Sequence, residues 1–366
     1  MSYQTKVGLK QFRNEGCLSY FFFDPVSRSA ALIDPHPQLM EEYRNYISEN
    51  GLKLLCTLDT HTHADHFSAT HLLRGEYGCA IAMSERTSSL RPTRKLRDRE
   101  KMELGELSLE VLDTPGHTPD SVCYYFSGFS SALVFTGDTL FIGSSGRTDF
   151  PGADAKAQWH SIHEVLGKLP GNTVVLPGHD YADLVFSTIE TESRKNAHWL
   201  IADLEQFIKM KNAEILEGGG DGMKVRIEFN RAANPPMMQE GAGAGMACGV
   251  APADGGRMAS INIEKYSHKL EERAPGTTFL DVRETEEFQA AHIPGASNIP
   301  ISELGLHLKE LSSKKRIYVN CLGGGRSSRA TKTLTYLGLA DVVNVSGGFK
   351  AWSQAGLPTE GQQVKK

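Results

Sequence analysis

The stretch from 58 to 71 reads L-D-T-H-T-H-A-D-H-F-S-A-T-H and holds four histidines and two aspartates. The whole chain of 366 residues contains 13 histidines, so this density needs a cause. A β-rich run at 54–59 comes just before it, which predicts that the cluster occupies the loop leaving the end of a strand. α/β proteins place chemical groups in such loops. The cluster consists of His61, His63, Asp65 and His66.

Polar residues also follow three other predicted strands, and a glycine that allows a sharp turn precedes each of them. They are His117 after 107–112, Asp138 after 132–135 and His179 after 173–176. Imidazole and carboxylate suit zinc, iron or manganese. A helix N-cap at Asp65 with exposed histidines would explain the cluster alone, but not the three further positions. The sequence therefore predicts a metal site where four strand ends converge.

The composition is that of an ordinary globular chain without a nucleic-acid or membrane partner. Hydrophobic residues make up 40% and charged residues 23%, and the net charge of −5 is spread without long runs of one sign. The longest apolar stretches, such as 18–23, are far shorter than the ~20 residues that a membrane span needs. The first residues show neither a signal core nor an Arg-rich transit peptide, so a cytoplasmic location is expected.

The six cysteines lie far apart and form no C-x-x-C pair. In a chain large enough to need no disulfides, this spacing indicates reduced thiols in a cytosolic setting. Most of them, such as Cys56 and Cys123 within apolar runs, are expected to be buried small hydrophobic residues. Cys321 differs, because a glycine-rich loop follows it.

The chain length favours two domains, and the first is predicted to be a mixed α/β domain with antiparallel character. Its expected strands are 17–24, 30–34, 54–59, 107–112, 122–126 and 132–136, and its expected helices are 38–49, 155–168 and about 183–211. Between about 212 and 258 the composition changes to Gly, Ala, Met and Pro. This change indicates irregular chain or linker, although a buried tail of the first domain could lie inside it.

After this segment, strand and helix patterns alternate, which predicts a small parallel sheet covered by helices. The expected strands are 278–282, 316–320 and 342–345, and the expected helices are 284–291, 302–311, 327–337 and 349–355. Cys321 ends one of these strands and opens the loop L-G-G-G-R before a helix. Backbone N–H groups in such a loop, together with the helix N-terminus, favour a nucleophilic thiolate.

The T-H-T-H-A-D-H motif, with His117, Asp138 and His179 downstream, resembles the signature of the metallo-β-lactamase superfamily over about 1–250. The resemblance implies a four-layer αβ/βα sandwich with the metal at the edge between two sheets. It is specific for the fold and the metal but not for the reaction. The expected organisation is a first domain at 1–250, a linker at 251–260 and a second domain at 261–366.

Four segments of 276–359 resemble a single rhodanese domain: F-L-D-V-R-E-T-E-E-F, A-A-H-I-P-G-A-S-N-I-P, Y-V-N-C-L-G-G-G-R-S-S-R-A and V-S-G-G-F-K-A-W. The resemblance implies that Cys321 carries a persulfide and that Arg326 binds an anionic sulfur donor or acceptor. Asp281 and Arg283 would brace the site. The anion would lie against Leu322, Gly323, Gly324 and Gly325. An inactive docking module is the alternative, but such modules usually lack the cysteine.

Two branches of the metallo-β-lactamase superfamily fit the metal residues. A glyoxalase II-like dizinc thioesterase would use two sets that share Asp138 and would attack a thioester with a bridging hydroxide. The first set is His61, His63, His117 and Asp138, and the second is Asp65, His66, Asp138 and His179.

A persulfide dioxygenase would instead hold one ferrous ion with two histidines and one aspartate. Its ligands would be His61, His117 and Asp138, which leave three adjacent positions for water, a persulfide sulfur and O2. The remaining groups would orient the ligands or move protons. These are His63, Asp65, His66 and His179.

Three segments resemble the dioxygenase branch more than glyoxalase II, namely G-S-S-G-R-T-D-F (143–150), L-P-G-H-D-Y (176–181) and M-A-C-G-V (246–250). Arg147 and Tyr181 are candidates for binding the carboxylate end of a glutathione-like substrate, because an arginine can grip a carboxylate with two hydrogen bonds. The alternative for Arg147 is a structural pair with Asp149. No chemistry is assigned to Cys248.

The rhodanese resemblance favours the dioxygenase, because both domains would then handle the same sulfane sulfur. The sequence thus predicts a bifunctional sulfur enzyme. One site would use a single Fe(II) to oxidise glutathione persulfide with O2 to sulfite and thiol. The other would transfer sulfane sulfur between thiosulfate or persulfide and thiol or sulfite through Cys321. The alternative is a dizinc thioesterase with a rhodanese appendage, and a homodimer is an expectation at the level of the family.

Overall fold

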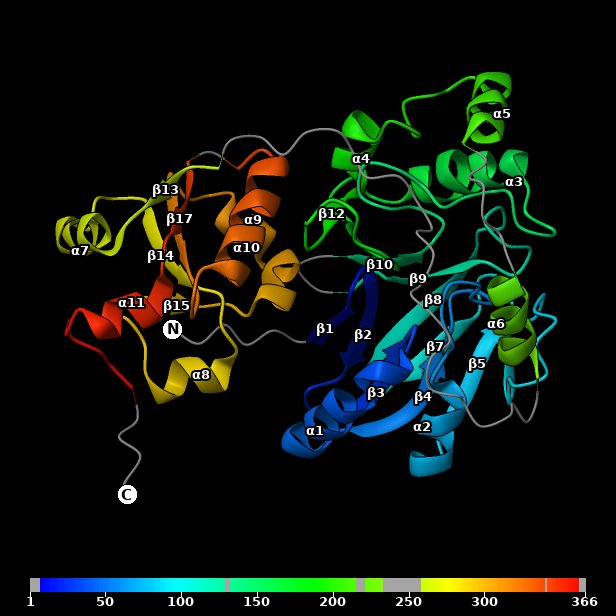
Figure 1. Cartoon of the computed structure of the whole chain (residues 1–366), viewed down its shortest axis with the longest axis horizontal. Helices are drawn as coiled ribbons and strands as arrows, with labels where there is room; N and C mark the ends of the chain where they lie inside the picture. The colour runs from blue at the N-terminus through cyan, green and yellow to red at the C-terminus, as the bar shows by residue number, and fades with distance from the viewer. Residues whose placement is uncertain (1–6, 129–131, 215–220, 233–257, 340, 362–366) are drawn as a thin grey trace. The chain divides into compact units, whose positions relative to one another are not determined.

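The computed structural model of the chain describes residues 7–128, 132–214, 221–232, 258–339 and 341–361 (Figure 1). Its contacts divide the chain into two compact units. One holds the described residues of 6–182 and 188–252, and the other holds those of 183–187 and 253–366. The linker predicted at 251–260 lies largely outside the described residues, and so does the segment around Cys248.

The larger unit contains two six-stranded sheets (Figure 1). The first consists of β1 (Gly8–Asn14), β2 (Cys17–Phe23), β3 (Ser29–Ile33), β4 (Lys53–Leu58), β5 (Ala80–Ser84) and β6 (Arg94–Leu96). Its first three strands pair antiparallel and its last four pair parallel. The second consists of β7 (Lys101–Leu104), β8 (Leu107–Asp113), β9 (Val122–Phe126), β10 (Leu133–Gly137), β11 (Val174–Pro177) and β12 (Ser187–Thr188). Within it β7 to β10 pair antiparallel, and β11 joins β10 in parallel.

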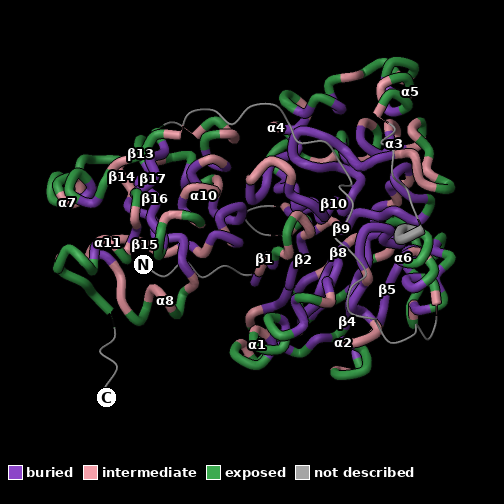
Figure 2. Tube along the Cα trace, in the orientation of Figure 1, coloured by how far each residue is buried: buried purple, intermediate pink, exposed green. Residues whose placement is uncertain are grey.

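Helices cover the outer face of each sheet, which gives four layers. The first sheet packs against α1 (Met40–Asn50) and α2 (Thr70–Tyr77), and the second against α3 (Ala155–His160), α4 (Ile189–Lys195) and α5 (Leu204–Ala213). α3 continues without a break through a wider turn at Ser161–Val165 and a tighter one at Leu166–Lys168. Figure 2 shows buried strands between exposed outer helix faces. The predicted αβ/βα sandwich is confirmed.

Strand β2 reads C-L-S-Y-F-F-F and is buried on both faces. The rings of Tyr20 and Phe22 pack against Phe135 of the other sheet, with centroids 5.3 and 5.8 Å apart. On the opposite face Phe21 packs against Tyr43 of α1 at 6.0 Å. Successive side chains of a strand point to opposite faces, so a continuous apolar run is what a strand between a sheet and a helix layer requires. Each fully buried ring stabilises the fold by roughly 1.5–3 kcal/mol.

The prediction of one helix at about 183–211 is wrong, because this segment contains β12, α4 and α5. α4 stops at Asn196, whose side-chain amide donates to the carbonyl oxygens of Phe141 (3.1 Å) and Ser144 (2.9 Å). α5 begins anew after Asp203, whose carboxylate caps its first turn. Asn and Asp side chains compete with the helical backbone in this way, and helices therefore tend to end or begin at them.

The segment at 212–258 contains α6 (Asp221–Arg231), so the part of it that the structure describes is not irregular chain. Arg226, Phe229 and Asn230 of this helix are buried. The ring of Phe229 packs at 4.5 Å against Phe67, which belongs to the loop that carries the histidine cluster. The alternative that a tail of the first domain lies in this segment is therefore confirmed.

The smaller unit contains a five-stranded sheet in which all neighbouring strands are parallel. In sheet order the strands are β13 (Ser260–Ile261), β17 (Val342–Val345), β16 (Arg316–Asn320), β14 (Thr277–Asp281) and β15 (Ser297–Asn298). The helices are α7 (Ile263–Glu272), α8 (Thr285–Ala290), a 3-10 helix at Ile301–His307 that leads into α9 (Leu308–Leu311), α10 (Gly325–Tyr336) and α11 (Gly348–Gln354). The predicted small parallel sheet is confirmed. Among the described residues, no helix combines the length and apolarity needed to cross a bilayer.

Candidate metal centre and sulfur-transfer site

The loop after β4 carries the histidine cluster, and the turns after β8, β10 and β11 carry the other predicted metal residues. Each of the seven side chains is at most 7% exposed; they are His61, His63, Asp65, His66, His117, Asp138 and His179. Gly116 and Gly137 have φ of 147° and 47°, a conformation that glycine adopts readily. A side chain on Gly137 would collide with Thr60, so this glycine also lets the end of β10 approach the histidine loop.

His61, His117 and Asp138 present one ligand atom each within 4.8 Å of one another. The Nδ1 atom of His61 lies 2.9 Å from the Thr60 hydroxyl, and Nδ1 of His117 lies 2.8 Å from the carbonyl oxygen of Arg147. Histidines that bind a metal through Nε2 usually donate from Nδ1 in this way. His61 Nε2 and Asp138 Oδ2 have no hydrogen-bond partner among the described residues, and His117 Nε2 lies 3.5 Å from Asp138 Oδ2.

The other four residues surround this triad. His179 connects the two carboxylates: its Nδ1 lies 2.8 Å from Asp138 Oδ1 and its Nε2 lies 2.9 Å from Asp65 Oδ2. His66 Nδ1 contacts the same Asp65 oxygen at 3.1 Å. His63 Nε2 lies 3.2 Å from Asp34, a buried aspartate that the sequence analysis did not single out. His63 Nδ1, Asp65 Oδ1 and His66 Nε2 have no hydrogen-bond partner in the described part of the chain.

The charges of this cluster are set by burial and by mutual contact. Burial lowers the pKa of His61 to about 3, and the neighbouring His63 adds to this effect. Burial opposes ionisation of Asp138, yet His179, His61 and His117 outweigh it and hold the pKa of this carboxyl below its usual value. The pKa of His179 is raised well above its ordinary value despite burial, because Asp138 and Asp65 flank it. The site therefore keeps its carboxylates ionised and holds His61 neutral, which is the state a metal ligand needs.

Helix α6 holds the histidine loop from outside, a contact that no sequence motif predicted. The Asn230 side chain donates to the carbonyl oxygens of His63 and His66, both at 2.9 Å, and accepts from Ser68 N at 2.9 Å. Arg226 Nε donates to the carbonyl oxygen of Ala64 at 2.8 Å. No spacing within the motif points to a helix more than 150 residues further along the chain, since these contacts join residues 162 to 167 positions apart.

The two predicted substrate-binding residues lie close to the metal residues. Arg147 is 7% exposed and makes a two-pronged ion pair with Asp149, with contacts of 2.8 and 2.5 Å. The structural alternative for Arg147 is therefore present. The ring of Tyr181 stacks on His179 with the centroids 5.7 Å apart.

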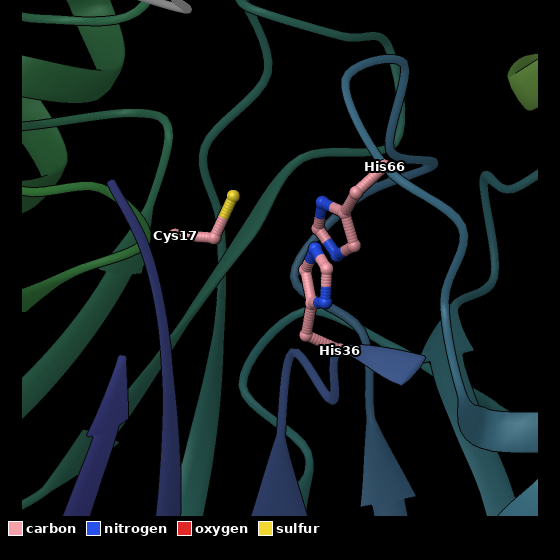
Figure 3. A group of neighbouring side chains, drawn as sticks. All are labelled: Cys17, His36 and His66. Atoms are coloured by element: carbon pink, nitrogen blue, oxygen red, sulfur yellow. The ribbon is translucent and has the colours of Figure 1, made fainter. Parts of the chain in front are cut away.

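A second group of side chains, Cys17, His36 and His66, adjoins the predicted site and was not predicted as a unit (Figure 3). Cys17 Sγ lies 3.5 Å from His179 Nε2 and 3.7 Å from Asp65 Oδ2. Burial opposes ionisation of this thiol, but contacts with His179, His36 and His66 lower its pKa to about 4. The backbone at Cys17 also forms an antiparallel bridge with His179, which joins the two sheets at the site.

In the smaller unit, Cys321 follows β16 and is 2% exposed. The backbone N–H of Gly324 donates to its Sγ at 3.1 Å, and α10 starts at the next residue. The N-terminal end of α11 fixes the loop, since Phe349 N donates to the carbonyl oxygen of Cys321 and Lys350 N to that of Leu322, at 2.8 and 2.9 Å. The predicted arrangement of strand, glycine-rich loop and helix around the thiol is present.

The charged residues predicted near Cys321 are paired in this structure. Arg326 makes a two-pronged pair with Glu287 of α8, with contacts of 2.6 and 2.8 Å. Asp281 and Arg283 bind each other through contacts of 2.9 and 3.0 Å and are at most 2% exposed. This burial fits the predicted bracing role of Asp281 and Arg283. Glu287 was not predicted, because it lies on another helix.

Family models match both parts of the chain. The metallo-beta-lactamase superfamily matches residues 16–179, and the rhodanese-like domain matches residues 264–355. The sandwich with its buried histidine and aspartate cluster, together with the parallel sheet and its cysteine loop, thus defines a metallo-β-lactamase-type domain followed by a rhodanese domain.

Similar proteins narrow this class. The mitochondrial persulfide dioxygenase ETHE1 of Mus musculus is 39% identical over 203 residues, which cover 55% of this chain and 78% of that protein. That of Homo sapiens is 38% identical over 193 residues, 52% of this chain and 74% of that protein. The chain belongs to the ETHE1 persulfide dioxygenase family and carries a C-terminal rhodanese domain. A probable hydroxyacylglutathione hydrolase of Schizosaccharomyces pombe is 31% identical over 207 residues, 52% of this chain and 80% of that protein.

Solved structures agree with the fold. The crystal structure of ETHE1 from Myxococcus xanthus matches with a TM-score of 0.58 and 31% identity, over 61% of this chain and 98% of that chain. A metallo-beta-lactamase from Staphylococcus aureus matches with a TM-score of 0.58 and 22% identity, over 93% of this chain and 99% of that chain. At this lower identity the second match shows the fold alone.

Proposed function

We propose that this chain is a bifunctional sulfur enzyme. The first domain oxidises a low-molecular-weight persulfide, glutathione persulfide, so that persulfide, O2 and water give the free thiol and sulfite. The second domain transfers sulfane sulfur through Cys321. The observation that carries the proposal is the pair of imidazoles, His61 and His117, with Nδ1 engaged and Nε2 facing Asp138, in a domain of the ETHE1 family.

The residues fit a metal ion with an open coordination sphere. Two neutral imidazole nitrogens and one carboxylate oxygen are the donor set of mononuclear iron oxygenases, and the donor atoms of His61 and Asp138 have no other partner among the described residues. We infer one Fe(II) per chain, held by these two and His117. When bound, the ion supplies adjacent positions for the persulfide sulfur and O2.

The surrounding side chains orient the ligands and hold a proton. The Thr60 hydroxyl donates to Asp34 at 2.9 Å and can accept from His61 Nδ1, which leaves Nε2 of His61 for the metal. His179, between Asp138 and Asp65, is placed to hold the proton that the released thiol takes up. Tyr181, whose ring stacks on His179, and Arg147, which pairs with Asp149, are the proposed contacts for the carboxylate of the substrate.

In the second domain, the Cys321 thiolate attacks the sulfane sulfur of thiosulfate. The sulfur–sulfur bond of thiosulfate breaks, sulfite leaves with the bonding electron pair, and a cysteine persulfide remains. The Gly324 N–H, 3.1 Å from Sγ, supports the anionic sulfur. A thiol or sulfite then takes the outer sulfur and regenerates the thiolate.

The test is metal content and oxygen uptake on protein purified without oxygen. One iron per chain, uptake that depends on glutathione persulfide and stoichiometric sulfite are expected. Two zinc ions per chain and no uptake would overturn the dioxygenase. Sulfur transfer from thiosulfate to cyanide or a thiol is measured separately on the same preparation.

A dizinc thioesterase is the second candidate. His63 Nδ1, Asp65 Oδ1 and His66 Nε2 lack hydrogen-bond partners among the described residues and could complete two coordination spheres. The likeness to a probable hydroxyacylglutathione hydrolase agrees with this candidate. Hydrolysis of a glutathione thioester without oxygen, by protein with two zinc ions per chain, would establish it.

A further inference from the structure

A thiol and two imidazoles meet beside the triad, and two of these three groups, Cys17 and His36, lie outside both ligand sets considered above. Cys17 comes from the start of β2, His36 from the loop after β3 and His66 from the loop after β4. One ligand atom of each lies within 4.8 Å of the other two. Figure 3 shows the two rings close together with the thiol beside them, and the ring centroids are 4.7 Å apart.

We propose that Cys17, His36 and His66 form a binding site for a second, thiophilic divalent cation such as Zn²⁺. One thiolate and two imidazoles are ligands that zinc prefers, whereas the neighbouring triad of two imidazoles and a carboxylate suits iron. In a tetrahedral zinc site, sulfur and nitrogen ligands lie about 3.5 Å apart. The present separations of up to 4.8 Å would close to this by small side-chain rotations.

The atoms around the cluster support coordination. His66 Nδ1 lies 3.1 Å from Asp65 Oδ2, and its Nε2 has no hydrogen-bond partner within the described residues, which is the usual pattern of a ligating histidine. Asp65 Oδ2 also lies 3.7 Å from Cys17 Sγ, so this carboxylate can complete the coordination. His36 and His66 are each 7% exposed, so the two imidazole ligands of the cation would be largely shielded from water.

Cys17 is surrounded by polar groups, since its Sγ atom lies 3.5 Å from His179 Nε2 and 3.7 Å from Asp65 Oδ2. Cys56 and Cys123 show the contrast, because both lie in the apolar core where burial raises the pKa of each thiol to about 12. Cys17 thus differs from Cys56 and Cys123, because its thiol lies beside two imidazoles whereas theirs pack in the apolar core.

The site differs from the dinuclear set of the thioesterase candidate, Asp65, His66, Asp138 and His179, in using Cys17 and His36 as ligands. Cys17 and His36 belong to neither that set nor the triad. Variants at these two positions therefore report on the proposed site alone. The proposed site shares only His66 and Asp65 with the dinuclear set. If zinc binds at the proposed site while iron binds at the triad, both ions will contact the loop after β4, which carries His61 and His66.

The experiment is titration of the iron-loaded full chain with Co²⁺ and Zn²⁺ in the absence of oxygen, in a Cys321→Ser background that removes the rhodanese thiol. One equivalent of Co²⁺ is expected to bind with a thiolate-to-cobalt charge-transfer absorption, and Zn²⁺ is expected to displace it. Cys17→Ser should abolish the absorption, and His36→Asn should weaken binding at least about 100-fold. Cys56→Ala is the matched control and should bind Co²⁺ unchanged.

Two outcomes would overturn the proposal. One is a charge-transfer absorption that persists in Cys17→Ser. The other is cobalt binding that survives both Cys17→Ser and His36→Asn but is lost in His179→Asn, because the dinuclear set would then hold the ion. Thermal unfolding followed by circular dichroism verifies that each variant is folded, and His36→Asn keeps an acceptor for Gln38 N, which now lies 3.4 Å from His36 Nδ1.

Discussion

The metal centre and the Cys321 loop are built in opposite ways. The metal centre uses side chains from His61 to His179, delivered by four different strand ends and fixed by hydrogen bonds to one another. The Cys321 site uses backbone groups of one short loop, fixed by the starts of α10 and α11. The first therefore depends on the type of each side chain and on the whole sandwich, and the second depends on local backbone geometry.

Asp138→Asn is one of the two substitutions with the largest expected effects. The amide keeps the size of the side chain but removes the charge that a metal ligand needs, so iron content should fall and persulfide-dependent O2 uptake should drop on the order of 10³-fold. Sulfur transfer should remain unchanged, because the residues assigned to its site, from Asp281 to Arg326, all belong to the smaller unit. Retained uptake would contradict the proposed triad, and parallel loss of both activities would contradict the independence of the two sites.

Cys321→Ser should produce the reverse pattern. A hydroxyl at this position is a far weaker nucleophile than a thiolate, so transfer of sulfur from thiosulfate should fall at least about 10³-fold. Oxygen uptake on added glutathione persulfide should not change. Unaltered sulfur transfer would indicate that the second domain only docks partners.

Gly348→Ala tests whether the Cys321 site depends on its backbone. Gly348 has φ of 52°, and a methyl group there would overlap the carbonyl oxygen of Cys321. Sulfur transfer should fall about 10-fold, because the loop must shift. Gly338→Ala is the control: its φ is 83° but nothing lies near the added methyl group, so it should cost only about 1 kcal/mol of stability and leave the transfer rate intact.

Asn230→Ala tests the support of the histidine loop by α6. The substitution removes three hydrogen bonds to the loop that carries His63 and His66, so iron affinity should fall roughly 10- to 100-fold. Val225→Ala on the same helix is the control, since Val225 is 53% exposed. Equal iron retention in both variants, measured by dialysis against a chelator, would show that α6 does not position the loop.

The smallest expected effect is that of Glu287→Gln. The carboxylate of Glu287 neutralises Arg326, so its removal should free Arg326 for anions and lower KM for thiosulfate about 3-fold, with kcat little changed. Glu286→Gln, an exposed neighbour on α8, should have no effect. A rise in KM would mean that Glu287 positions Arg326 for the substrate.

The contrast between side chains gathered from separate strands and a single contiguous loop also explains which features could be predicted from the sequence. The fold and the two clusters of chemical residues were predictable, because the histidines follow strand ends and the cysteine is followed by a contiguous glycine loop. Helix α6 was not, because glycine-rich chain flanks it and because Arg226, Phe229 and Asn230 are the buried residues in its described part, 224–231, while Val225 is exposed. An apolar periodicity is absent where a helix is held by polar contacts.

Two site residues also escaped prediction for a physical reason. Cys17 and His36 each stand alone in the sequence, and only the pairing of β2, β3 and β4 within one sheet brings them to His66. Likewise, the single helix predicted at about 183–211 failed because Asn196 and Asp203 bind backbone groups in three dimensions. Side chains that act across long sequence separations leave no local pattern.

The backbone bridge between Cys17 and His179 links the stability of the sandwich to the retention of a bound metal. Two backbone hydrogen bonds join the sheets along the edge where the metal residues meet. Leu18 N donates to the carbonyl oxygen of Gly178 at 2.8 Å, and Asp180 N donates to that of Gly16 at 2.9 Å. His61 follows a strand of the first sheet, whereas His117 and Asp138 follow strands of the second, so a metal bound by these three residues would be held by both sheets. We therefore expect the metal to be lost when the sheets separate along this edge, so that its rate of release reports on that separation.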